Sequence, residues 1–251
     1  MSNITIAFIL TFIAGLSTML GSILIFLKDK RGVVLKYSLS FAAGVMICVS
    51  TIDLIPESIE LLFNRNKNQT FILIFIFMAT GIIISYIIDK CIPENQTQNK
   101  NNNLLKVGVF SMIAIILHNI PEGIATFLSS ATNIKLGIAL TIAIALHNIP
   151  EGISISIPIF KATKSRKKAL LYTFVSGMSE PFGAILAYLL LAPIINDTIM
   201  GILLALIAGI MIHIGSIKLL PTALNYNNKK RTLLFFIIGI LFMYLSHTLM
   251  N

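Results

Sequence analysis

Eight long apolar runs dominate the chain and leave few folds open to it. Crossing a bilayer takes about 20 mainly apolar residues in a helix. Only 12% of the 251 residues are charged, 56% are hydrophobic, and the mean hydropathy is +0.90. A soluble domain carries about twice that charged fraction. We therefore predict an all-α, polytopic membrane protein in one domain over 1–251, with spans at about 5–27, 34–57, 70–92, 104–128, 134–160, 169–193, 198–223 and 232–250.

The basic residues lie on alternate connections between these runs. Cytoplasmic loops carry an excess of Lys and Arg, so this bias predicts the orientation. It places the odd-numbered connections in the cytoplasm and both termini outside. The basic residues on the cytoplasmic side are Lys28, Lys30, Arg31, Lys36, Lys90, Lys100, Lys106, Lys161, Lys164, Arg166, Lys167, Lys168, Lys218, Lys229, Lys230 and Arg231. Only Arg65, Lys67 and Lys135 lie on the other side.

Several functions are disfavoured by composition. The net charge of +9 is spread over loops without interleaved aromatic residues, so we expect no nucleic-acid partner. The two cysteines, Cys48 and Cys91, have no ligand spacing, which excludes a thiolate zinc site. A polar, low-complexity segment at about 92–103 is predicted to be a cytoplasmic linker without chemistry of its own.

Two segments resemble each other at a constant offset of 165 residues. AAGVMICVSTIDLIPES begins at Ala42, and AGIMIHIGSIKLLPTA begins at Ala208. The first lies in an outward-running span and the second in an inward-running one. Repeats of opposite orientation are common in transporters, so we expect an inverted repeat.

The hexapeptide HNIPEG occurs twice, in the fourth and fifth spans. In a helix, residues four apart lie on one face. His118 therefore stacks with Glu122, and His147 with Glu151. Adjacent antiparallel spans would bring both pairs to one point near the middle of the bilayer. Two imidazoles and two carboxylates are a plausible shell for zinc, iron or manganese.

Further polar residues lie at the same depth. Asn119, Asn148 and Glu180 could form a second, oxygen-rich set that shares Glu122 and Glu151. Ionised carboxylates are costly inside a membrane unless they are paired, and a bound divalent cation would remove that cost.

Acidic and basic residues near the span ends have weaker interpretations. Asp53 and Glu57, at the outer end of the second span, are either a solvated helix end or an acidic entrance that attracts cations. His213 and His247 are more simply explained as hydrogen-bonded core residues than as ligands. The sequence assigns no role to Lys218.

The doubled HNIPEG motif resembles the ZIP (Zrt-, Irt-like) metal transporter family, and the resemblance extends to FAAGVM at Phe41, SGMSEPFGA at Ser176 and AGIM at Ala208. It implies eight spans, both termini outside, import into the cytoplasm across a bacterial inner membrane, and a homodimer. It also implies a binuclear site. One metal would bind His118, Glu122, His147 and Glu151; the other would bind Asn119, Asn148 and Glu180, with Glu122 and Glu151 as bridges.

One departure from the family concerns the inner end of the seventh span. Relatives often carry acidic residues there, whereas this chain has Ile217 and Lys218. A family-like cytoplasmic exit site is therefore in doubt.

We expect alternating access around the mid-membrane site, with zinc as the first candidate substrate and Fe²⁺, Mn²⁺ or Cd²⁺ as others. The metal would be a cargo and not a cofactor. The alternative is an intramembrane zinc-dependent hydrolase, which would need an open metal position and a separate general base. Two symmetric His/Glu sets without a distinct base favour transport.

Overall fold

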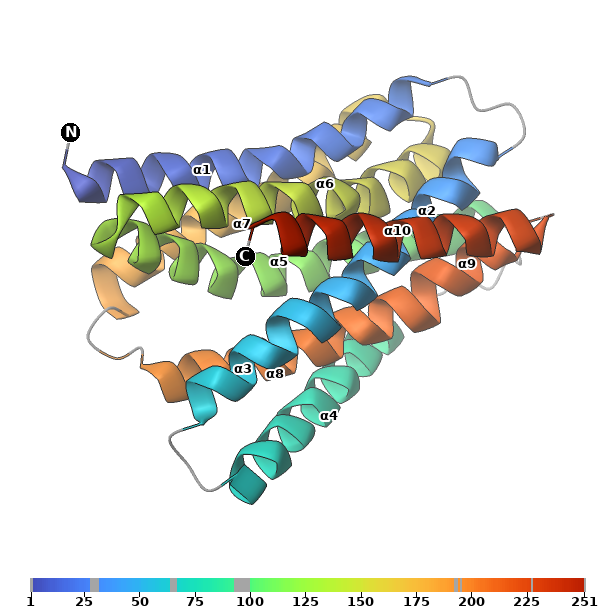
Figure 1. The fold of residues 1–251 in the computed structure, drawn as a ribbon. Helices are drawn as coiled ribbons and strands as arrows, with labels where there is room; N and C mark the ends of the chain where they lie inside the picture. Colours follow the sequence, from blue (N-terminus) through green and yellow to red (C-terminus); the bar gives the residue numbers. More distant parts are fainter. Residues whose placement is uncertain are drawn as a thin grey trace.

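The computed structural model describes residues 2–27, 32–63, 67–92, 100–191, 194, 196–226 and 228–250. Over these residues the chain is helical and contains no β-strand. Eight helical segments are long and apolar enough to cross a membrane, which confirms the predicted fold class. Figure 1 shows them as long helices packed together in one bundle.

The predicted spans and the observed helices agree to within a few residues, and the helices tend to be longer. The second continues to Leu62 and the fourth to Thr132, past the apolar stretches. The elements are α1 (Asn3–Leu20), η1 (Gly21–Phe26), α2 (Val33–Val49), η2 (Ser50–Leu54), α3 (Ile55–Leu62), α4 (Lys67–Cys91), α5 (Lys100–Thr132), α6 (Ile134–Thr163), α7 (Arg166–Leu186), η3 (Ala187–Leu191), α8 (Asp197–His213), η4 (Ile214–Leu219), α9 (Leu220–Leu224) and α10 (Lys229–Met250).

Part of the predicted topology lies outside the described residues. This applies to residues 93–99 of the predicted linker and to the basic residues Lys28, Lys30, Arg31 and Arg65.

A single residue separates α5 from α6. Asn133 has extended backbone angles, and its side chain accepts from the backbone N–H groups of Lys135 and Leu136. Such a cap satisfies donors that the first turn of a helix leaves free. The chain therefore reverses direction within one residue, and α5 and α6 pack as an antiparallel pair.

Two π-helical segments occur at matching places in the two repeat-like sequences. The segment η2 precedes Pro56, and η4 precedes Pro221. Proline has no N–H to donate, and a wide turn accommodates the missing hydrogen bond. By contrast, Pro121 and Pro150 lie inside α5 and α6, which continue as α-helices past them.

The helices form two groups. One contains α1, α5, α6 and α7, which pack against one another; in the other, α2 packs along α10 and α4 along α8. These groups are seen in Figure 1 as the upper helices and the diagonal lower helices, with α10 across the front. Buried apolar residues from both groups, among them Leu39, Phe110, Ile155 and Ile207, form one continuous core cluster.

Glycines bring backbones into direct contact within each group. A Cβ added at any of four glycines in the spans would lie 2.1–2.4 Å from a carbonyl oxygen of another helix. These glycines are Gly44, Gly177, Gly183 and Gly209. Real Cβ atoms do not approach so closely, so only glycine fits at these positions. The helices are thereby held at a fixed separation, which sets the geometry of the polar residues between them.

Candidate metal centre

The two HNIPEG motifs meet side by side in α5 and α6. The Nε2 atom of His147 lies 2.6 Å from Oε1 of Glu122, across the helix pair. The Nε2 atom of His118 lies 3.5 Å from Oε2 of Glu122 and 3.5 Å from Oε1 of Glu151. The ligand atoms of His118, Glu122 and His147 all lie within 4.8 Å of one another. Three of the four predicted donors thus converge, and Glu151 adjoins them through its contact with His118.

This cluster is almost completely buried. The side chains of His118, Glu122, His147 and Glu151 are 2%, 11%, 9% and 1% exposed. Both ring nitrogens of His118, both carboxylate oxygens of Glu151 and Oε2 of Glu122 have no hydrogen-bond partner among the described residues. An uncompensated buried charge costs several kcal/mol. Imidazole and carboxylate are donors that divalent zinc accepts, and a cation at this point would compensate the charge.

The oxygen-rich set lies beside the same glutamates. Asn148 donates from Nδ2 to Oε2 of Glu180 at 2.9 Å, and all of Asn119, Asn148 and Glu180 are fully buried. The Oδ1 atoms of both asparagines and Oε1 of Glu180 have no hydrogen-bond partner among the described residues. The arrangement leaves several unpaired oxygens, the ligand type that a second, harder cation site requires.

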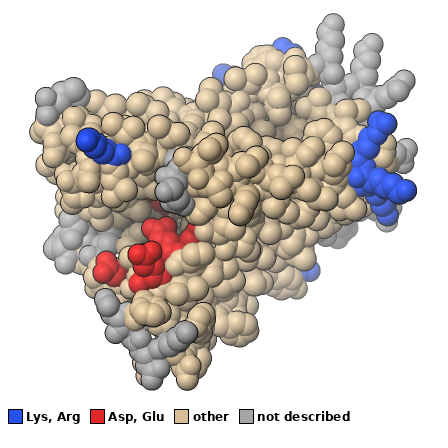
Figure 2. All heavy atoms as spheres, in the orientation of Figure 1, with Lys and Arg blue, Asp and Glu red and all other residues tan. Residues whose placement is uncertain are grey.

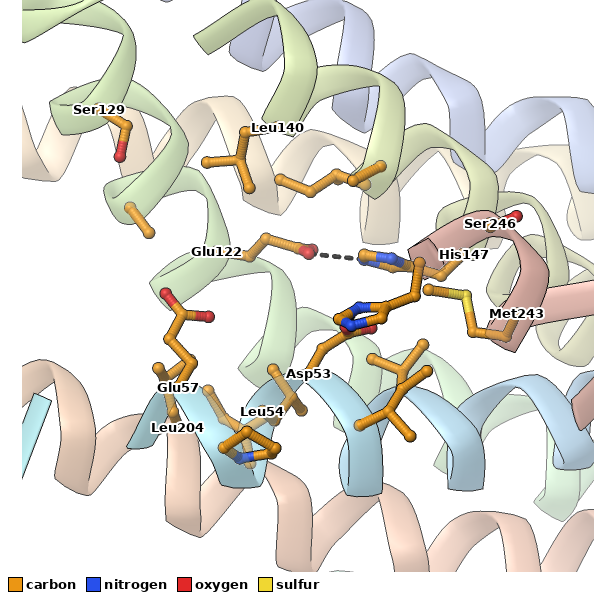
Figure 3. Close-up of a pocket in the computed structure, with 18 of the residues that line it drawn as sticks. Asp53, Leu54, Glu57, Glu122, Ser129, Leu140, His147, Leu204, Met243 and Ser246 are labelled. Atoms are coloured by element: carbon orange, nitrogen blue, oxygen red, sulfur yellow. Dashed lines mark hydrogen bonds and ion pairs between the residues drawn. The ribbon is translucent and has the colours of Figure 1, made fainter. Parts of the chain in front are cut away.

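A cavity of about 440 Å³ opens from the cluster toward one end of the bundle. His118, Glu122 and His147 line its inner part, and Asp53, Glu57 and Glu60 line it from the second span. Figure 2 shows acidic side chains gathered in a hollow of the molecular surface. In Figure 3, Glu122 and His147 point toward one another, and Asp53 and Glu57 project into the same space. A cation entering from this end would pass these carboxylates before it reached His118 and His147.

The sequence did not predict that His247 lies in this cavity. His247 of α10 lines it, and its Nδ1 atom forms an ion pair with Oδ1 of Asp53. A lone histidine near the end of the last span carries no sequence signal for this contact. The contact arises because α10 packs along α2, a pairing between segments almost 200 residues apart.

A different polar cluster lies between α4, α5 and η4, away from the cavity. Lys218 in η4 donates from Nζ to Oδ2 of Asp89 at 2.5 Å, and Nζ of Lys106 lies 3.7 Å from Oδ1 of the same carboxylate. His213 shares a hydrogen bond of 2.9 Å, through Nδ1, with Ser85. Asp89 is therefore matched by two ammonium groups, and His213 has a structural partner, as the sequence had favoured.

Comparison with known proteins identifies one family. The sequence profile described as "ZIP Zinc transporter" matches residues 2–107 and 94–247. "Zinc transporter ZupT" of Clostridium perfringens is 42% identical, over 98% of this chain and 96% of its own length. The proteins of the same name from Streptococcus mutans and Campylobacter jejuni are 41% and 39% identical, over 96% and 99% of this chain and 96% and 98% of their own lengths.

We predict that Glu122→Gln weakens zinc binding by roughly tenfold or more, equivalent to about 1.4 kcal/mol. Glu122 is the carboxylate that contacts both histidines, and an amide has no charge to offer the metal. Isothermal titration of the detergent-purified protein with zinc chloride measures the change.

Asp197→Asn is the matched control, because Asp197 is exposed in the first turn of α8 and lies outside the cavity. Equal zinc affinity in the Glu122 variant and the wild-type chain would show that the metal binds elsewhere.

Proposed function

Because the chain belongs to the ZIP zinc transporter family, we propose that it carries zinc across the bacterial cell membrane into the cytoplasm, through the buried His/Glu cluster of α5 and α6. The observation that supports this most directly is a buried cluster of His and Glu side chains, several of whose polar atoms have no hydrogen-bond partner among the described residues, at the inner end of an acid-lined cavity. The ZIP family consists of transporters, so the hydrolase alternative is not supported.

The metal would bind in a binuclear site. The first ion would take His118, Glu122 and His147, whose donor atoms converge, together with Glu151, which lies 3.5 Å from His118. The second takes Asn119, Asn148 and Glu180, with Glu122 and Glu151 as bridges. Their unpaired buried oxygens support this assignment. Since this mixed nitrogen and oxygen set also suits Fe²⁺, Mn²⁺ and Cd²⁺, we include these ions as competing substrates.

An inverted repeat would relate the halves of the protein. Gly44 contacts the carbonyl of Phe236, and Gly209, its partner at an offset of 165, contacts that of Met78. Gly239 contacts the carbonyl of Phe41, and Gly81 contacts that of Leu206. Phe41 and Leu206 are again 165 positions apart. Matched contacts at constant offsets are what a two-fold relation between α2–α10 and α8–α4 produces, and they support the repeat.

We propose that this arrangement is the outward-open form of an alternating-access cycle. The cavity reaches the metal cluster from the end where the second span finishes and the fifth begins. Toward the opposite end, the α5 residues Leu104, Val107 and Phe110 are buried in the core cluster, which also contains residues of α2 and α8. Asp89 adds an ion pair from α4 to Lys106 of α5, which joins the two helix groups at the closed end.

The orientation follows from the basic residues. If the eight membrane-capable helices of the described residues all cross, the two termini lie on one side, and the excess of Lys and Arg on the odd-numbered connections supports that side being outside the cell. The homodimer that the resemblance implies stays a prediction.

In proteoliposomes, the wild-type chain should take up radioactive zinc with saturation, and Glu122→Ala and Glu151→Ala should reduce the rate by roughly 100-fold, or about 2.7 kcal/mol in barrier height. Each variant removes a carboxylate that both proposed ions share. The control variant Asp197→Ala should keep the wild-type rate. Competition by unlabelled iron, manganese and cadmium salts in the same vesicles would rank the substrates. Tight zinc binding without uptake under any gradient would overturn the transport function.

The orientation predicts labelling from one side only. A cysteine introduced at Ser2, in a variant in which Cys48 and Cys91 are replaced by Ala, should react with a membrane-impermeant maleimide in intact cells. A cysteine at Lys164, on the connection between α6 and α7, should react only after the cells are opened. The reverse pattern would contradict the assignment.

Breaking the ion pair at the closed end should favour the inward-open form. In Asp89→Asn, both lysines lose their counter-ion, and the first turns of α5, over residues 104–114, should exchange backbone hydrogens several-fold faster. Hydrogen–deuterium exchange with mass spectrometry measures this, with Asp197→Asn as the control. Unchanged exchange would show that apolar packing alone closes the inner end.

A further inference from the structure

The first span contributes no side chain to the proposed metal site, but its backbone contacts that site. Asn148 donates from Nδ2 to the carbonyl oxygen of Ala14 in α1 at 3.0 Å. Asn119 donates from Nδ2 to the carbonyl oxygen of Ser176 in α7 at 3.2 Å. Ala14 and Ser176 are 162 positions apart, the same offset as Gly15 and Gly177, which directly follow them.

These bonds determine which end of each amide faces the helix backbone. A carbonyl oxygen only accepts hydrogen bonds, so the NH₂ end of the amide must face it. For Asn148 the second N–H donates to the carboxylate of Glu180, so both donors are used. In both residues, Oδ1 is then the buried polar atom left without a partner. Each amide is thus held with its oxygen free to bind a cation.

The carbonyls that hold these amides lie where α1 and α7 touch. A Cβ at Gly15 would lie 2.4 Å from the carbonyl oxygen of Gly177, and a Cβ at Gly177 would lie 2.4 Å from that of Gly15. The two backbones are therefore in contact, and any larger residue at either position must push them apart. Such a shift would move the carbonyls of Ala14 and Ser176, one residue away, off the amides.

We propose that α1 and α7 form a backbone clamp on the second metal position. In this clamp, the carbonyls of Ala14 and Ser176 orient the amides of Asn148 and Asn119 so that Oδ1 faces the ion. Gly15 and Gly177 are positioning residues, because they set how closely the two carbonyls approach. The inference rests on the proposed binuclear site and assigns a function within it to a helix that supplies no ligand.

The first test counts bound zinc. The purified wild-type chain, Gly15→Ala and Gly177→Ala are titrated with zinc chloride by calorimetry, and metal content after gel filtration is measured by mass spectrometry. The clamp predicts two zinc ions in the wild-type chain. In both glycine variants the ion held by the four His and Glu donors stays, and the other binds at least tenfold more weakly.

Gly209→Ala is the matched control. It crowds a carbonyl oxygen equally, at 2.1 Å from Met78, but in the helix group that does not hold the asparagines. It should lower the unfolding temperature as the other two do, yet keep both ions. Equal loss of zinc in all three variants would reduce the role of Gly15 and Gly177 to general packing and overturn the clamp.

A second variant keeps the test decisive if the glycine variants do not fold. Asn119→Asp retains a ligand oxygen but replaces the donor nitrogen by an acceptor that faces the Ser176 carbonyl. The clamp predicts weaker binding of the second zinc, by at least tenfold. If Asn119 were only a ligand, the charged carboxylate would bind zinc more tightly, and that result would overturn the proposal.

The wild-type titration separates this inference from transport itself. A wild-type chain that binds a single zinc ion would overturn the second metal position and the clamp together. Saturable zinc uptake by the same protein in proteoliposomes would still support the proposed function.

Discussion

The need to compensate three glutamates in the interior of an apolar bundle governs the rest of this structure. Glu122, Glu151 and Glu180 lie in spans that would otherwise be stable in lipid, and the ion pairs described for Glu122 and Glu151 are with histidine. Two histidines carry at most two positive charges against three carboxylates, whereas a divalent cation bound between them would supply the missing charge. A bound metal would therefore stabilise the cluster, and the acid-lined cavity opens onto it.

A second constraint is the closeness of the helix backbones around this cluster. Gly123 and Gly152 directly follow Glu122 and Glu151, and a Cβ at either would lie 1.9 Å from a carbonyl oxygen, of Glu180 and Thr18 respectively. Without side chains at these positions, α7 and α1 reach the turns that carry the glutamates. The carbonyls of the neighbouring helices then become hydrogen-bond acceptors for the asparagines. Glycine spacing and ligand geometry are thus two aspects of one packing arrangement.

The sequence predicted features that depend on neighbouring residues, and it did not predict contacts between distant segments. Apolar runs and the spacing of His118 and Glu122 are local, because they depend on bilayer thickness and on the helical repeat. The pairs Asp53–His247 and Asp89–Lys218 depend on which spans lie side by side, and no local period encodes that. The acidic entrance was therefore an open alternative, and Asp89 carried no signal until α4 was seen to pack along α8.

In the proposed inverted repeat, these two long-range pairs occupy corresponding places at opposite ends of the bundle. The offset of 165 that relates Gly44 to Gly209 also relates Asp53 to Lys218, and the offset of 158 that relates Gly81 to Gly239 also relates Asp89 to His247. The outer pair has its acid on the second span, lining the cavity; the inner pair has its acid on α4, matched by two lysines. In the proposed transport direction, a cation would meet an attractive carboxylate on entering and a positively charged region on leaving. In this proposal, the difference in charge between the two corresponding positions would favour capture of the cation on one side and its release on the other, where no second binding site would hold it.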